Sequence, residues 1–316
     1  MAIRSKWQSL PTEAINPATL GIDKLGSADI VELMIGEDRK MLSAVAREKE
    51  RIALGAELIA QSLRKGGRVL FVGAGTSGRL GVLESAEMPP TFGTDQTLVQ
   101  AIMAGGRPAT FRAKEGVEDN YDEGARAISR LRPGRKDVVV GVSASGMTPF
   151  VRGALTRARK AGAKILFVTC DPRTELQAFV DLMIAPSVGP EVIAGSTRLK
   201  AGTATKMVLN MLTTTAMVRI GKTYGNLMVD VRTGSEKLRD RARRIVNIVT
   251  GLDYEQADEL LRRARWNVKA AVVMQKADLS YPKAISRLRK AKGLVRDALG
   301  EDIEPRLRDL IHHHLA

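Results

Sequence analysis

Residues 71–80 are FVGAGTSGRL, in which an apolar strand pattern ends in glycines and hydroxyls and a helical pattern follows at once. Glycines let backbone N–H groups approach a bound anion, and the N-terminus of the helix adds a favourable dipole. The hydroxyls of Thr76 and Ser77 add two donors beside Gly75. The segment therefore predicts a phosphate-binding loop, formed by Gly75, Thr76 and Ser77, at the end of a strand.

The same glycines also fit a dinucleotide-binding fingerprint, G-x-G-x-x-G, at Gly73, Gly75 and Gly78. That fingerprint expects an acidic residue at the end of the next strand, where it holds a ribose. Here the next strand pattern ends in Met-Ala-Gly-Gly at residues 103–106, without an acid. A nicotinamide cofactor is therefore disfavoured.

A second loop of similar composition, SASGMTP, spans residues 143–149 between a strand pattern and a helical pattern. Ser143, Ser145 and Thr148 supply three hydroxyls around Gly146. A single loop of this kind is equally compatible with a helix N-cap. Two such loops on successive strands favour a phosphate site, and we expect all four residues to contribute to it.

A third loop, residues 195–206, combines hydroxyls with the cations Arg198, Lys200 and Lys206. The guanidinium and ammonium groups suit a substrate phosphate or carboxylate. They are equally compatible with solvated charges ahead of a buried helix. Arg198 and Lys200 are taken as candidate substrate-binding residues.

The fold expected around these loops is α/β. Apolar strand patterns alternate with helical patterns, which indicates a parallel sheet covered on both faces with ligands at the carboxyl ends of its strands. An N-terminal arm includes a helical pattern near 28–63, broken near Gly36, and a buried helix is expected from 203 to about 220. The strand patterns are 68–72, 98–103, 138–142, 164–169 and 181–185.

Two domains are predicted. The sheet with its N-terminal arm occupies residues 1–237, and a small all-α domain occupies residues 238–316. Within the small domain the helical patterns cover about 238–250, 254–264, 267–277 and 280–298.

Composition excludes several classes of function. The chain has 316 residues and a net charge of +15, but no run of five or six like charges and only 4% aromatics, so a nucleic-acid partner is not expected. No apolar stretch is long enough for a membrane span. With a single cysteine, Cys170, and no histidine before 312–314, metal sites and Ser-His-Asp or Cys-His chemistry are disfavoured. A cytoplasmic enzyme with no metal is expected.

Acid–base chemistry must then rest on carboxylates, lysines or tyrosines. Two groups of acids follow the first loop along the chain. On residue type alone, each is also compatible with a solvated surface charge. These acids are Glu84, Glu87, Glu115, Glu118 and Asp119.

The position of Glu87 raises a geometric problem. Its helix is expected to end at Pro89 and Pro90. If residues 78–87 are helical, Glu87 lies about 14 Å from the first loop, at 1.5 Å per residue. Either the helix leans over the site, or Glu87 serves a site completed by another subunit. The second option predicts an obligate oligomer.

Several of these segments together resemble the N-acetylmuramic acid 6-phosphate etherases, a family of the sugar isomerase (SIS) fold. The resemblance spans most of residues 12–231, and the C-terminal module is loosely similar to a ubiquitin-associated-like domain. The matching segments are Thr12-Glu13 with Asn16-Pro17, GAGTSGRLGVLESAEMPPTFG (73–93), KEGVED (114–119), SASGMTPFV (143–151), GSTRLKAGTATKMVLNMLTT (195–214) and YGNLMVDV (224–231).

The resemblance implies cleavage of the D-lactyl ether of N-acetylmuramic acid 6-phosphate, by elimination of lactate and addition of water, without metal or organic cofactor. By matched position, Glu87 is the proton donor and Glu118 is the base. The donor must stay protonated, which requires a poorly solvated setting. The first two loops hold the sugar phosphate, and the protein is a homodimer in amino-sugar recycling.

Three other interpretations remain open. A non-catalytic sugar-phosphate sensor of the same fold needs the loops but no carboxylate pair. An aldose–ketose sugar-phosphate isomerase is the other enzymatic alternative. A DNA-binding regulator is least favoured, because no helix-turn-helix pattern precedes Arg68.

Overall fold

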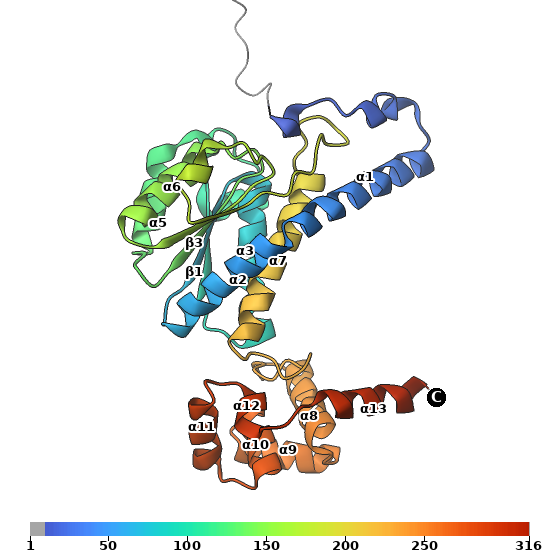
Figure 1. Cartoon of the computed structure of the whole chain (residues 1–316), viewed down its shortest axis with the longest axis vertical. Coiled ribbons are helices and arrows are strands. Elements are labelled where there is room, and N and C mark those ends of the chain that lie inside the picture. Colours follow the sequence, from blue (N-terminus) through green and yellow to red (C-terminus); the bar gives the residue numbers. More distant parts are fainter. Residues whose placement is uncertain (1–9, 316) are drawn as a thin grey trace, which may run out of the picture. The chain divides into compact units, whose positions relative to one another are not determined.

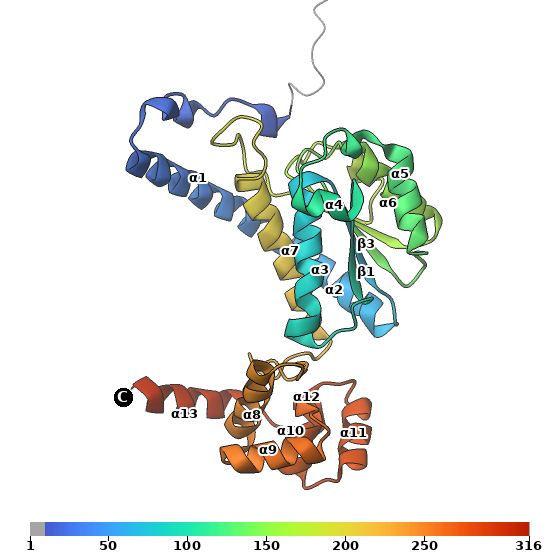
Figure 2. The ribbon, with the colours of Figure 1, turned by 180° about the vertical axis from the view of Figure 1, so that it is seen from behind.

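The computed structural model describes residues 10–315, which divide into two compact units (Figures 1 and 2). The first unit extends to Ala86, resumes over Gln96–Thr215, and contains a five-stranded sheet. The second unit combines Glu87–Asp95 with the chain from Ala216 onward. Residues 1–9, the start of the predicted arm, lie outside the described part.

The sheet is parallel, with the strand order β2-β1-β3-β4-β5. Every residue of β1 and β3 is buried, as expected for the central strands of a sheet covered on both faces. The predicted parallel α/β sheet is confirmed, and each predicted strand agrees with an observed one to within one residue at either end. The strands are β1 (Val69–Gly73), β2 (Val99–Met103), β3 (Val138–Val142), β4 (Lys164–Val168) and β5 (Leu182–Ile184).

Helices cover both faces of this sheet. In Figures 1 and 2, α5 and α6 lie on one face, whereas α2, α3 and α7 lie on the other. Alternate side chains of β1 supply the two cores: Leu70 and Val72 pack with Phe150 of α6, and Phe71 lies against Gly81 of α3. The bounds are α2 (Lys49–Arg64), α3 (Gly75–Phe92), α4 (Gly106–Phe111), α5 (Tyr121–Arg130), α6 (Pro149–Lys160) and α7 (Lys200–Arg219).

Glycine lets α5 and α6 approach closely. A Cβ added to Gly124 would lie 1.9 Å from the carbonyl oxygen of Phe150. We expect Gly124→Ala to lower the free energy of unfolding by about 1–3 kcal/mol, because the two helices must separate. Urea denaturation of this variant beside Gly134→Ala, whose added Cβ has no neighbour within 4 Å, tests this. Equal midpoints for the two variants would contradict it.

The N-terminal helical pattern is interrupted at Glu48 rather than near Gly36. Helix α1 (Ser27–Arg47) passes through Gly36, and α2 begins at Lys49. A glycine inside a helix costs only about 1 kcal/mol, which packing readily offsets. The carboxylate of Glu48 instead accepts a hydrogen bond from the backbone N–H of Ala185 at 3.2 Å, which fixes the turn there.

The second unit has its own core, which changes the expected domain boundary. Tyr224, Val229 and Val231 are buried in the same cluster as the C-terminal helices, so the connection from 216 to 237 belongs with these helices rather than with the sheet. The helix expected over 280–298 is divided near Gly293, where φ is +82°. The helices are α8 (Glu236–Thr250), α9 (Tyr254–Arg263), α10 (Val268–Ala277), α11 (Tyr281–Lys290), α12 (Val295–Leu299) and α13 (Glu304–Leu315).

Among the helices of residues 10–315, none has both the length and the hydrophobicity that a membrane crossing requires.

Candidate functional site

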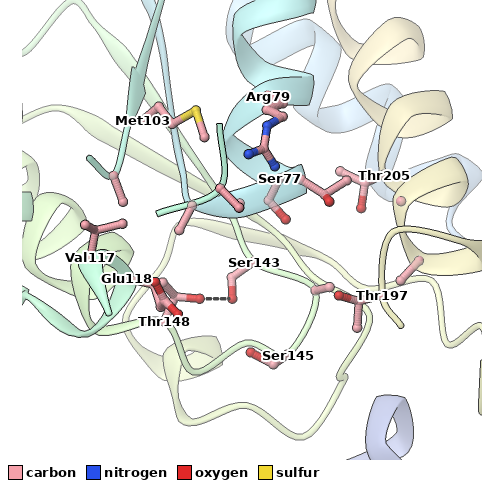
Figure 3. Close-up of a pocket in the computed structure, with 18 of the residues that line it drawn as sticks. Ser77, Arg79, Met103, Val117, Glu118, Ser143, Ser145, Thr148, Thr197 and Thr205 are labelled. Atoms are coloured by element: carbon pink, nitrogen blue, oxygen red, sulfur yellow. Dashed lines mark hydrogen bonds between the residues drawn. The ribbon is translucent and has the colours of Figure 1, made fainter. Parts of the chain in front are cut away.

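A cavity of about 340 Å³ opens at the carboxyl ends of β1 and β3 (Figure 3). This is the edge of a parallel sheet at which α/β proteins bind ligands. All three loops singled out in the sequence contribute to its lining. The lining residues from these loops include Gly75, Thr76, Ser77, Ser143, Ser145, Thr148, Gly195 and Thr197.

The first loop is a tight junction between β1 and α3. A Cβ on Gly73 would lie 2.7 Å from the backbone nitrogen of Gly78, so the strand end and the first helical turn touch. Gly75 has φ +54°, a conformation that glycine adopts without strain. Because α3 begins at Gly75, its first-turn N–H groups have no partner within the helix and are available to a ligand. This geometry is compatible with the predicted anion cradle, which stays a prediction.

The second loop brings its hydroxyls together. The side-chain oxygens of Ser143 and Thr148 lie 2.7 Å apart, and Ser145 lines the same cavity (Figure 3). Gly146 does not line this cavity. Its φ of +71° makes the turn, and its carbonyl accepts a hydrogen bond from the hydroxyl of Thr174 at 2.7 Å. Gly146 thus shapes the loop rather than facing the cavity.

The third loop differs from expectation at both of its candidate cations. Arg198 is exposed and outside the cavity lining. Lys200 is only 2% exposed, and its ammonium donates to a carboxylate oxygen of Glu37 at 2.6 Å. Lys200 is therefore engaged by a buried acid on α1 and does not face the cavity. The loop lines the cavity with Gly195 and Thr197 instead.

Two buried acids hold this region in place. Burial alone would raise the pKa of Glu37, but hydrogen bonds from Lys200, Lys40 and Asn16 outweigh it and lower the pKa to about 2. The carboxylate of Glu191 accepts the backbone N–H groups of Lys200 and Ala201, at 3.0 and 2.9 Å, at the start of α7. Sequence patterns gave no signal for either acid, because their partners are far away along the chain.

Among the predicted acids, Glu118 lies at the cavity. It belongs to a short 3-10 turn, Val117–Asp119, that follows Gly116 at φ +76°. Figure 3 shows Glu118 and Thr148 among the residues that line this cavity. Glu115 also lines the cavity, as does Glu13 from the N-terminal arm. Glu118 and the hydroxyls of the second loop are therefore brought together.

Glu84 and Glu87 have different surroundings. Glu84 is buried and accepts hydrogen bonds from Asn210 and Thr213 of α7, so it ties two helices together. Glu87 is exposed and is not among the residues that line the cavity. Helix α3 runs from Gly75 to Phe92 and passes through Pro89 and Pro90 instead of ending there as predicted.

Two basic residues of the cavity were not predicted as site residues. Arg79 and Lys114 are the basic side chains among the described residues that line the cavity. Arg79 stands two positions after Ser77, within the segment that predicted the phosphate loop, so its place in the sequence was a usable signal. In residues 10–315, no three His, Cys, Asp or Glu side chains converge as metal ligands do.

Comparison with known proteins finds one matching family model, curated relatives and similar solved structures. Residues 51–159 match the model of the glucokinase regulatory protein N-terminal SIS domain. An N-acetylmuramic acid 6-phosphate etherase of Salinibacter ruber is 50% identical over 296 residues, which cover 93% of this chain and 95% of the relative. The etherase of Rubrobacter xylanophilus is 48% identical, covering 94% and 98%. A solved phosphoheptose isomerase from Francisella tularensis has a TM-score of 0.47 at 18% identity, covering 61% of this chain and 98% of that one.

Proposed function

Because the chain belongs to the N-acetylmuramic acid 6-phosphate etherases, we propose that it cleaves the D-lactyl ether of this sugar phosphate. The products are N-acetylglucosamine 6-phosphate and D-lactate, and the bond is a carbon–oxygen bond, so the enzyme is a lyase. We place the reaction in the cytoplasm, on amino sugar recovered from peptidoglycan.

The phosphate binds in the cradle of the first two loops. Ser77, Ser143, Ser145 and Thr148 provide hydroxyl donors, and the first turn of α3 provides backbone N–H groups. Hydroxyls and helix N-termini suit phosphate without a fixed counter-charge. The sugar then extends from this cradle along the cavity, which brings its ring carbons toward Glu118.

The chemistry needs one base and one acid. Glu118 removes the proton from carbon 2 of the open-chain sugar, which leaves an enolate with the carbon 1 aldehyde. The double bond between carbons 2 and 3 then forms as the ether oxygen leaves carbon 3. A protonated Glu87 gives its proton to that oxygen, which releases D-lactate. Water then adds to carbon 3, and the proton returns to carbon 2.

Glu87 reaches this site from a second copy of the chain. In one chain it is exposed and outside the cavity lining, which does not suit a donor that must stay protonated. The described chain also exposes apolar side chains on α1, namely Val31 (55%), Ile35 (48%) and Leu42 (48%), which a second copy would cover. A homodimer with shared sites accounts for both features.

The observation that carries the proposal is that Glu118 lines the same cavity as the hydroxyls of the second loop. Turnover of N-acetylmuramic acid 6-phosphate in ¹⁸O-labelled water tests the reaction. We expect the label in the carbon 3 hydroxyl of N-acetylglucosamine 6-phosphate, because water adds there. Label in D-lactate would contradict elimination, and binding of the sugar phosphate without lactate release would indicate a regulator instead.

Removal of the phosphate-facing hydroxyl of Thr148 is expected to weaken binding. Thr148→Val keeps the side-chain volume and loses one hydrogen bond to a charged group, so the Kd for N-acetylglucosamine 6-phosphate should rise about tenfold or more. Calorimetric titration measures this. Thr156→Val, on the exposed side of α6, is the control and should bind as the wild type does. An unchanged Kd in Thr148→Val would remove Thr148 from the phosphate site.

Mixing inactive variants tests the shared site. Glu87→Gln is expected to keep proton exchange at carbon 2 and to block lactate release, whereas Glu118→Gln loses both. If each site combines Glu87 of one subunit with Glu118 of the other, random subunit exchange should restore about a quarter of wild-type activity, since half the dimers carry one intact site. No restoration after verified exchange would place both residues in the same chain.

A further inference from the structure

Arg79 is fixed in place at the cavity wall. It is half-buried, its Nε donates to the carbonyl of Thr110 at 3.1 Å, and its Nη2 donates to the carbonyl of Ala109 at 2.9 Å. These two carbonyls belong to the end of α4, so the guanidinium links α3 to α4. Among residues 10–315 it forms no ion pair with a carboxylate. A cation that is held rigidly in a ligand cavity and has no acidic partner can bind an anionic group of the ligand.

The geometry of the two hydrogen bonds defines which anion fits. Nε and Nη2 lie on one edge of the planar guanidinium, and that edge is occupied by the carbonyls of Ala109 and Thr110. The other edge, which carries Nη1 and the second proton of Nη2, is not used by these two hydrogen bonds. Two parallel N–H groups on such an edge match the two oxygens of a carboxylate. The free edge of Arg79 is therefore suited to a bidentate carboxylate contact.

Arg79 lies away from the second-loop part of the proposed phosphate cradle. Figure 3 places Arg79 on the side of the cavity opposite Ser145 and Thr148, with Ser77 between them. Three acids, Glu13, Glu115 and Glu118, line the cavity together with two bases. Because these carboxylates repel an anion, any substrate anion outside the phosphate cradle needs a basic side chain that holds it in place. Lys114 is exposed, and its flexible side chain offers a point charge without a fixed direction.

We propose that Arg79 binds the carboxylate of the lactyl group, which makes it a specificity-determining residue of the substrate site. This inference rests on the proposed function, since it assumes that the ligand carries a lactyl ether. The phosphate lies in the hydroxyl cradle, and the carboxylate lies on the free edge of Arg79. Contacts at both ends of the substrate hold the ether bond between them.

Binding of two ligands tests this assignment. N-acetylmuramic acid 6-phosphate carries the lactyl carboxylate, and N-acetylglucosamine 6-phosphate lacks it. In a Glu118→Gln background, which prevents turnover, we expect Arg79→Gln to raise the Kd for the first ligand about 10- to 100-fold, the loss of a hydrogen-bonded charge contact. The Kd for the second ligand should change less than about threefold. Lys114→Gln should change either Kd less than about fivefold, because its charge is exposed.

The ratio of the two affinities separates a binding role from a structural one. A parallel loss for both ligands would overturn the inference, because it indicates a disturbed α4 or a phosphate contact. An unchanged ratio in Arg79→Gln, or a selective loss in Lys114→Gln, would also overturn it. If Arg79→Gln fails to fold, Arg79→Lys serves instead, with a smaller selective loss expected because lysine lacks the planar fork. Failure of the proposed function is distinguishable, since the wild type would then release no D-lactate.

Discussion

Replacing Glu118 with glutamine is expected to lower the rate of D-lactate release by about 10²- to 10⁴-fold, the usual contribution of a positioned general base. The amide keeps the size of the side chain at the cavity but cannot accept the carbon 2 proton. Steady-state assay of released D-lactate measures the change. Exchange of the carbon 2 hydrogen with deuterium oxide, followed by NMR, should fall by a similar factor, because proton removal is the step affected.

Glu115→Gln is the matched control, since Glu115 lies three residues before Glu118 and lines the same cavity. Its turnover should stay within a few-fold of the wild type, as expected for an exposed acid outside the reaction. A large loss in Glu115→Gln with near-normal Glu118→Gln would transfer the role of base to Glu115. Calorimetric binding of N-acetylglucosamine 6-phosphate to each variant verifies that the cavity is intact.

Glu37→Gln is expected to lower the free energy of unfolding by about 3–5 kcal/mol. Glu37 is 4% exposed and Lys200 is 2% exposed, so the variant leaves a buried ammonium without its carboxylate. Denaturant unfolding at pH 7 measures the loss. Glu37→Leu combined with Lys200→Met removes both charges and should recover much of it, because the cost arises from the unpaired charge. A double variant as unstable as Glu37→Gln would contradict this explanation.

The same pair predicts how stability depends on pH. The folded protein holds the pKa of Glu37 at about 2, below its ordinary value near 4.5. The resulting stabilisation is present above pH 4.5 and is lost as the pH falls toward 2, since protonation is easier in the unfolded chain. It amounts to about 3 kcal/mol in total, of which about 2 kcal/mol should be lost between pH 7 and pH 3. Glu37→Gln should lack this component when unfolding is compared at the two pH values.

Local sequence determined the strands and the loops that follow them. Apolar runs such as 138–142 are buried on both faces of a parallel sheet, and this burial gives them a pattern that is visible without knowledge of their partners. The glycines and hydroxyls of the first two loops were likewise predictable, because a backbone that approaches an anion needs Gly75 and because donors must stand next to it. Thr76, Ser77, Ser143, Ser145 and Thr148 all line the cavity as expected.

Residue type did not decide which charged groups face the cavity. Arg198 and Lys200 carry suitable charges, but only the packing of α1 against the start of α7 brings Glu37 to Lys200, across 163 positions of sequence. Arg79 is held at the cavity because its guanidinium donates to two carbonyls at the end of α4. No local sequence pattern predicts these hydrogen bonds. The sequence by itself determined the sheet, the loops of glycines and hydroxyls that line the cavity, and the acids available for chemistry. Only the tertiary structure decided which cation is neutralised by a buried acid and which remains for a ligand, because charge pairing depends on distances between segments far apart in the chain.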